Sequence, residues 1–157
     1  MLHTDFHTHT TFCDGKSTPR EMVEAAYRMG MTDFGVSGHA DFSMFEPGFG
    51  MDDEKLRQYT EELQELREEY RGKMNLYIGI ELDGLGPVQK AEYAIGSTHA
   101  LIKDGEYVCV DDTEEKLVKQ SRRCGMVTGT PLHGSISRQR RRFMTGQNAI
   151  SSDILTC

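Results

Sequence analysis

The sequence predicts an α/β protein, in which strands and helices alternate around a parallel sheet or barrel. Four short apolar runs have the composition of strands, and the first three are separated by segments with the helical spacing of apolar residues. Both of those segments also open with helix-capping residues. Such alternation is typical of βαβ units, whose strands pair in parallel.

The first predicted helix has clear start and stop signals. Before it, Leu2–Phe6 has the composition of a short strand. Thr18-Pro19-Arg20-Glu21 then supplies an N-cap, a proline at the first helical position and a capping-box glutamate in register. Gly30 is a suitable C-terminal stop. The face that we expect this helix to bury consists of Met22, Ala25, Ala26 and Met29.

A second strand and helix follow. Phe34–Ser37 is predicted to be a strand. Met44–Gly50 is rich in Phe, Pro and Gly, and we expect this loop to cover a pocket. Asp52 or Asp53 then begins a long helix. Its apolar residues recur at spacings of three and four, as in an amphipathic helix: Leu56, Tyr59, Leu63, Leu66 and Tyr70.

The remaining predicted elements are two strands and a helix. Leu76–Ile80 and Tyr93–Gly96 are short apolar runs that contain Ile and Tyr, which favour strands. Asp112–Glu115 has the composition of a helix start, and we expect that helix to continue through Leu117 and Val118. These elements extend the regular pattern to about residue 119.

Histidine and acidic residues follow the predicted strands at their carboxyl ends. His7 and His9 are spaced i, i+2, so alternation along an extended chain points both rings to the same side. Parallel sheets and barrels assemble their active sites at this edge, and histidine is the commonest metal ligand. The sequence therefore predicts a metal site formed by His7, His9, Asp14, His39, Glu81 and His99.

Each candidate ligand also has a purely structural interpretation. In this interpretation, one of His7 and His9 is exposed and the other is hydrogen-bonded without binding a metal. Taken singly, His39 is typical of a turn residue satisfied by backbone, and Glu81 of a surface carboxylate. Asp14 lies in a predicted loop, where its carboxylate is also suited to cap the following helix. The combination of all six favours the metal site.

Composition and charge restrict the class of protein. The 157 residues suffice for one domain with a sizeable core, and the net charge of −7 argues against nucleic-acid binding. No apolar run approaches the ~20 residues that span a bilayer, and no basic-then-apolar signal begins the chain, so we expect a cytoplasmic protein. The cysteines form no C-x-x-C pair and are expected to be reduced, with Cys13 near the metal site but not a ligand.

Five short motifs resemble, in order and spacing, the PHP (polymerase and histidinol phosphatase) metal-dependent phosphoesterases. They are Asp-Phe-His-Thr-His-Thr, Cys-Asp-Gly, Ser-Gly-His-Ala-Asp, Gly-Ile-Glu-Leu and Ile-Gly-Ser-Thr-His. The resemblance covers about residues 1–119. Within the family, the likeness is closest to the stand-alone histidinol-phosphatases of histidine biosynthesis. The resemblance implies the N-terminal half of a distorted (β/α)7 barrel, incomplete in this chain.

The same resemblance implies a cofactor and a mechanism. The family holds a cluster of three divalent metal ions (Zn, Mn or Fe), and a metal-activated water attacks the phosphorus of the substrate. The catalytic group is thus water, and no catalytic side chain is assigned. Matched position by position, the first metal pair is His7 and His9, the third-metal ligands are Asp14 and His39, the bridging carboxylate is Glu81, and a second-metal ligand is His99.

Residues 120–157 differ in composition from the rest of the chain. The charge balance is −12 for residues 1–119 and +5 for residues 120–157, and no Glu or Lys follows Lys119. One interpretation of Arg138–Arg142 is a basic arm for nucleic acid. We favour a one-base deletion near Lys119, which makes residues 120–157 an out-of-frame, poorly structured tail without a selected function.

A permitted choice of codons is compatible with this interpretation of the tail. One permitted choice for Asn148–Cys157 is AAC GCG ATA TCG TCG GAC ATT TTG ACC TGT. Read from its third base, this choice encodes Arg-Asp-Ile-Val-Gly-His-Phe-Asp-Leu. That segment contains the Gly-His that the family carries after a later strand and that this chain lacks. The family's final Asp-x-His is also missing.

Three functions remain open. The first is histidinol-phosphatase, which hydrolyses L-histidinol phosphate to L-histidinol and phosphate, with this chain an inactive and poorly soluble fragment. The second is another PHP phosphoesterase that acts on nucleotides or as an exonuclease, although the chain has no polymerase domain. The third is a non-catalytic metal or nucleic-acid binding module that uses Arg138–Arg142. The expected partner is a small phosphomonoester, with no membrane and no nucleic acid.

Overall fold

The computed structural model describes residues 4–43, 48–103, 105–109 and 119. The chain divides into two compact units. The first runs to Leu82 and includes Gly86–Ile95, and the second contains Asp83–Leu85 and the residues from Gly96 onward. The predicted helix at Asp112–Glu115 and the predicted tail at 120–157 lie outside the described residues, as do residues 44–47 of the predicted covering loop.

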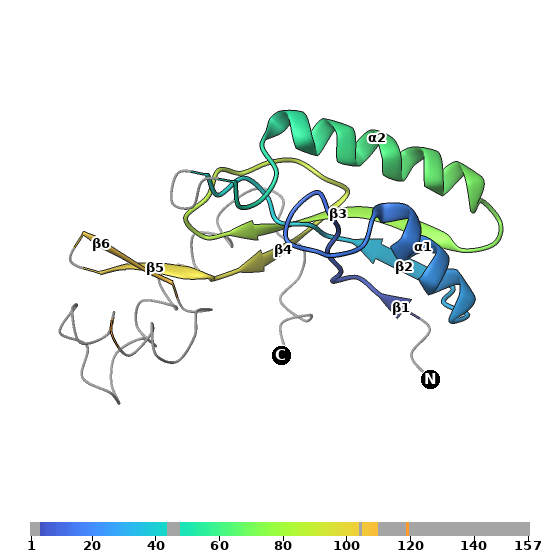
Figure 1. The fold of residues 1–157 in the computed structure, drawn as a ribbon, viewed down its shortest axis with the longest axis horizontal. Helices are drawn as coiled ribbons and strands as arrows, with labels where there is room; N and C mark the ends of the chain where they lie inside the picture. Colours follow the sequence, from blue (N-terminus) through green and yellow to red (C-terminus); the bar gives the residue numbers. More distant parts are fainter. Residues whose placement is uncertain (1–3, 44–47, 104, 110–118, 120–157) are drawn as a thin grey trace. The chain divides into compact units, whose positions relative to one another are not determined.

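Among the described residues, four strands form a sheet in the order β1-β2-β3-β4 (Figure 1). Their bounds are Thr4–Asp5 for β1, Asp33–Val36 for β2, Asn75–Asp83 for β3 and Tyr93–Ser97 for β4. β1 pairs in parallel with β2, and β2 in parallel with β3, where Phe34 lies opposite Leu76. The α/β class and the parallel pairing that the sequence predicts are therefore confirmed.

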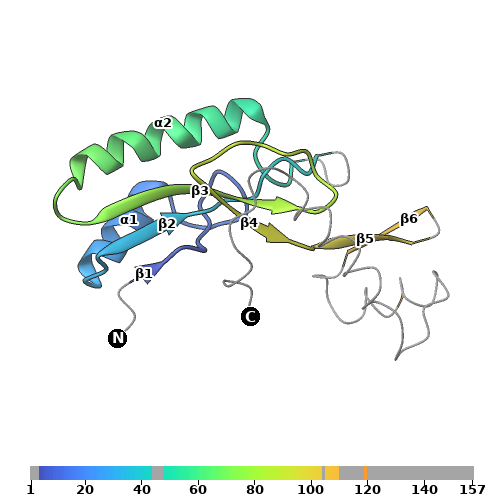
Figure 2. The same ribbon diagram turned by 180° about the vertical axis from the view of Figure 1, so that it is seen from behind.

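Two helices, α1 (Pro19–Arg28) and α2 (Asp53–Glu69), connect the parallel strands. Both begin where the sequence predicts: Thr18 and Glu21 form the capping box, and Asp52 accepts a hydrogen bond from the N–H of Lys55. Because such crossovers are right-handed and the strand order follows the chain, both helices cover one face of the sheet. Figure 2 shows them from behind. Neither of these described helices is long and apolar enough to cross a membrane.

Apolar side chains fill the space between the two helices and the sheet. Tyr59 of α2 is fully buried, and its hydroxyl lies 2.7 Å from the Val36 carbonyl and 2.9 Å from the Gly79 carbonyl, which ties the helix to β2 and β3. Burial of each large aliphatic side chain stabilises the fold by about 1.5–3 kcal/mol. The other large core residues include Val23, Phe34, Leu63, Leu66 and Ile80.

The buried face of α1 agrees with the predicted one only at Ala26. The helix buries Pro19, Val23 and Ala26, whereas Met29 is 66% exposed. Spacings of four and three place the three buried residues on one stripe of the helix, beside the stripe that was expected to be buried. β3 is also longer than predicted, so Glu81 lies within the strand and not after its end.

The second unit contains an antiparallel hairpin that our sequence interpretation missed. β5 (Ala100–Lys103) pairs with β6 (Glu106–Cys109), and Lys103 lies opposite Glu106. Gly105 has a φ of 82°, in the left-handed region that two-residue hairpin turns require. An Asp-Gly pair between two apolar runs is a known hairpin signal, and it is present at positions 104–105.

Candidate metal centre

His7 and His9 follow β1 and point to the same side of the chain, as their spacing predicts. Their ring centroids are 5.3 Å apart. The intervening Thr8 is buried, and its hydroxyl donates a hydrogen bond to the Gly35 carbonyl at 2.9 Å. The Ser37 N–H donates to the Thr8 carbonyl, so main-chain pairing continues past β1. This pairing fixes where the two imidazoles leave the backbone.

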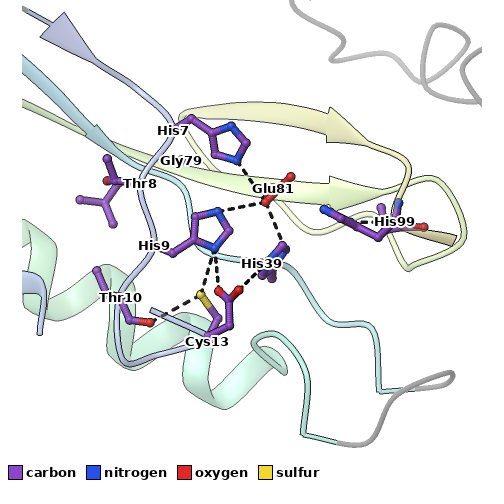
Figure 3. A network of polar contacts seen from close by, with 12 residues as sticks. His7, Thr8, His9, Thr10, Cys13, His39, Gly79, Glu81 and His99 are labelled. Atoms are coloured by element: carbon purple, nitrogen blue, oxygen red, sulfur yellow. Dashed lines mark hydrogen bonds and ion pairs between the residues drawn. The ribbon is translucent and has the colours of Figure 1, made fainter. Parts of the chain in front are cut away.

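The carboxylate of Glu81 is the point at which three imidazole rings meet (Figure 3). Glu81 is 3% exposed. Its Oε2 lies 3.2 Å from Nε2 of His7, 3.1 Å from Nε2 of His9 and 3.1 Å from Nδ1 of His39. Main-chain hydrogen bonds on both sides of Glu81 join it to the backbone beside His39, so the pairing of β2 with β3 extends to this level.

Asp14 contacts the opposite ring nitrogens of two of these histidines, His9 and His39. Its Oδ1 is 2.8 Å from Nδ1 of His9, and its Oδ2 is 3.4 Å from Nε2 of His39. The N-cap of α1 is Thr18, so Asp14 does not cap that helix. Among its described residues, the first unit thus contains two overlapping groups of possible metal ligands: His7, His9 and Glu81, and His9, Asp14 and His39.

The groups around His9 strongly favour a positive charge at its position. Hydrogen bonds with Cys13, Glu81 and Asp14 raise the pKa of His9 to about 11, against the opposing effect of burial. Cys13 Sγ lies 3.7 Å from His9 Nδ1, and although burial raises the pKa of the thiol, the contact with His9 helps to lower it overall. A metal ion binds the neutral imidazole and not the protonated imidazolium. A metal ion and a proton are therefore alternative cations in this cluster.

The loop that carries Asp14 turns tightly against the backbone of His9. The N–H groups of Cys13 and Gly15 both donate to the carbonyl of Thr10 at 3.0 Å. A Cβ added at Gly15 would lie 2.6 Å from the His9 carbonyl oxygen, closer than real Cβ atoms approach. Glycine is therefore required here by space.

Gly15→Ala is expected to destabilise the protein by about 1–3 kcal/mol, the usual cost of forcing extra atoms into a packed position. Because the clash is with the backbone of His9, the affinity for zinc should fall as well. Urea unfolding and zinc titration measure the two effects. Lys16→Ala, at the exposed neighbouring position, is the control and should change neither. If Gly15→Ala were as stable as the wild type, the close approach of Gly15 to the His9 backbone would be contradicted.

His99 lies in the second unit, between β4 and β5. In that unit its backbone nitrogen is 2.7 Å, and its Nδ1 3.2 Å, from Oδ2 of Asp83. The other five candidate ligands come together in the first unit. The place of His99 in the metal site stays a prediction.

Two neighbours of the candidate ligands were not identified from the sequence. The ring of Phe49 packs 4.5 Å from the ring of His39, centroid to centroid. The sequence signal for Phe49 was its place in the Phe-rich segment Met44–Gly50, which was predicted to cover a pocket. Asp83 contacts His99 within the second unit, and only its spacing of two residues from Glu81 marked it in the sequence.

A family model matches most of this chain. The model of the PHP domain family matches residues 5–138, which extends past Lys119 into the segment predicted to be out of frame. The histidinol-phosphatase of Bacillus subtilis (strain 168) is 27% identical over 147 residues, which cover 81% of this chain and 55% of that protein. The chain spans about half the length of the histidinol-phosphatases that it matches.

Two solved structures have the same fold over about half of their length. A protein from Listeria monocytogenes described as a histidinol phosphatase gives a TM-score of 0.61 at 20% identity. This match covers 73% of the present chain and 51% of the Listeria chain. The histidinol phosphate phosphatase of Lactococcus lactis gives a TM-score of 0.52 at 23% identity, with coverage of 77% and 51%. The chain therefore belongs to the PHP domain family, and its sheet and helices form an incomplete (β/α) barrel of that family.

Proposed function

We propose that this chain carries part of the active site of a metal-dependent phosphomonoesterase whose substrate is L-histidinol phosphate. The observation that supports this proposal most is the buried Glu81 carboxylate, which faces three imidazole nitrogens at 3.1–3.2 Å. A carboxylate and several imidazoles gathered at the carboxyl edge of a parallel sheet are suited to hold metal ions.

The spacing of these atoms fits a bound transition metal. Around a tetrahedral zinc ion with bonds of about 2.0–2.1 Å, neighbouring ligand atoms are about 3.3 Å apart. The distances from Glu81 Oε2 to the three nitrogens are close to that separation. Zinc, manganese and iron are the proposed metals, up to three ions in the intact family. The proposed ligands are His7, His9, Asp14, His39 and Glu81, with His99 as the sixth ligand predicted from the sequence.

The residues of the chain hold this arrangement before a substrate arrives. Divalent ions at such a site activate water at neutral pH and neutralise the charge on phosphate oxygens. Main-chain hydrogen bonds fix Glu81. Asp14 contacts Nδ1 of His9 and so orients that ring with its Nε2 towards Glu81. A preorganised set of ligands lowers the entropy that is lost when ions and phosphate bind.

The choice of substrate is supported by the relatives. The Lactococcus lactis structure is a complex with zinc, L-histidinol and phosphate, and the Bacillus subtilis relative is named histidinol-phosphatase. Because this chain spans about half of each protein, we expect it to hydrolyse the substrate slowly by itself.

Phosphate-release assays test this proposal. With Zn²⁺, Mn²⁺ or Fe²⁺, the purified chain should hydrolyse L-histidinol phosphate faster than adenosine monophosphate or an oligonucleotide, and a chelator should abolish the activity. His7→Ala should remove this activity, while Lys16→Ala should retain it. Faster release from the nucleotides would favour another phosphoesterase. Release that persists in the chelator and in His7→Ala would contradict a metal-dependent reaction at this site.

A further inference from the structure

The side chain of Asp83, at the end of β3, is fixed by hydrogen bonds within the second unit. Its Oδ1 accepts a hydrogen bond from the Leu85 N–H at 2.8 Å, and its Oδ2 accepts one from the His99 N–H at 2.7 Å. The Asp83 side chain is 6% exposed. Two backbone donors, one for each oxygen, therefore hold the buried carboxylate in one orientation.

The same carboxylate also faces the imidazole of His99. Nδ1 of that ring lies 3.2 Å from Asp83 Oδ2. An ionised carboxylate only accepts hydrogen bonds, so the hydrogen between the two groups belongs to Nδ1. In a neutral imidazole with its hydrogen on Nδ1, the lone pair lies on Nε2. Neutral histidine in water prefers the opposite tautomer, so this contact selects a tautomer as well as an orientation.

We propose that Asp83 is a positioning residue, which holds the imidazole of His99 with its hydrogen on Nδ1 and so presents Nε2 as the metal-ligating nitrogen. This proposal rests on the proposed metal-dependent function, to which it adds a residue that is not itself a ligand. Metal-ligating histidines commonly donate their other ring N–H to a carboxylate, which fixes the tautomer and raises the basicity of the ligating nitrogen. The 18% exposure of the His99 side chain leaves the ring partly accessible.

Nitrogen-15 NMR of the full chain tests this assignment without any catalytic reaction. Two-bond correlation spectra, recorded at a pH where the ring is neutral, distinguish a hydrogen on Nδ1 from one on Nε2. A His99→Gln variant identifies the His99 signals. In the wild-type protein we expect the hydrogen on Nδ1, and in Asp83→Ala on Nε2. Zinc titration of Asp83→Ala should give an affinity ~10–100-fold lower than that of the wild type.

Asp52→Ala is the matched control, because Asp52 also accepts a backbone hydrogen bond but lies in the first unit at the start of α2. It should leave the tautomer of His99 unchanged. A hydrogen on Nε2 in the wild-type protein would overturn the proposal even if Asp83→Ala failed to fold, and so would an unchanged tautomer in a folded Asp83→Ala. If the wild-type chain bound no zinc, the metal-dependent function would fail, whereas the tautomer would still report on the Asp83 contact.

Discussion

Glu81→Ala is expected to lower the affinity for Zn²⁺ by more than ~100-fold, because losses of residues that only support a metal ligand already cost ~10–100-fold. Glu81 is 3% exposed and contacts three imidazoles, so water cannot readily replace its carboxylate. Glu81→Gln preserves the size of the side chain and removes its charge, and it should also bind zinc far more weakly. Isothermal titration calorimetry measures both affinities.

Glu65→Gln provides the matched control for this loss. Glu65 is an exposed residue of α2, and the same substitution there should leave zinc binding unchanged. NMR titration gives a second readout, because a hydrogen bond with Glu81 is among the causes that raise the pKa of His9. In Glu81→Gln that pKa should fall from about 11. If Glu81→Gln bound zinc as tightly as the wild type, Glu81 would not be a ligand at this site.

Restoring the proposed reading frame should raise phosphatase activity by more than ~100-fold. We propose that one base is missing near the codon for Lys119, and that the restored frame supplies ligands absent from the present chain. Loss of ligands, together with the groups that orient them, costs more than the ~10–100-fold of a single supporting residue. Insertion of one base at this codon, followed by a phosphate-release assay with L-histidinol phosphate, measures the gain.

His9→Ala in the restored protein should abolish the recovered activity, which ties the gain to the candidate site. Insertion of three bases at the same codon adds a residue without changing the frame, and is the control. If the restored protein were no more active than the present chain, the frameshift interpretation would be wrong. If it bound metal but cleaved only other phosphoesters, the substrate assignment would fail while the family would stand.

Local signals in the sequence were sufficient to predict the helix starts and the approach of five candidate ligands to one another. The capping box at Thr18 and Glu21 acts within four residues, so no tertiary information was needed. The spacing of His7 and His9 similarly fixes their common direction in an extended segment. The contact between His39 and Glu81 followed from the rule that parallel strands gather their carboxyl ends at one edge, although Glu81 lies within β3 and not after it.

Features that depend on packing were harder to predict. Met22, Ala25, Ala26 and Met29 form a plausible apolar stripe, but the side of α1 that contacts the sheet is decided by the strands, and it contains Val23. The contact of Asp83 with His99 joins residues sixteen positions apart, and the sequence pattern did not specify it. The close approach of Gly15 to the His9 backbone likewise arises from the folded loop.

Anomalous diffraction from crystals of the chain soaked with zinc tests the central claim most directly. We expect an anomalous peak within about 2.0–2.2 Å of a ring nitrogen of His7, a ring nitrogen of His9 and a carboxylate oxygen of Glu81. A matched crystal of Glu81→Gln should lose that peak. Zinc bound only elsewhere on the protein, with the contacts between Glu81 and the imidazoles unchanged, would contradict the metal centre.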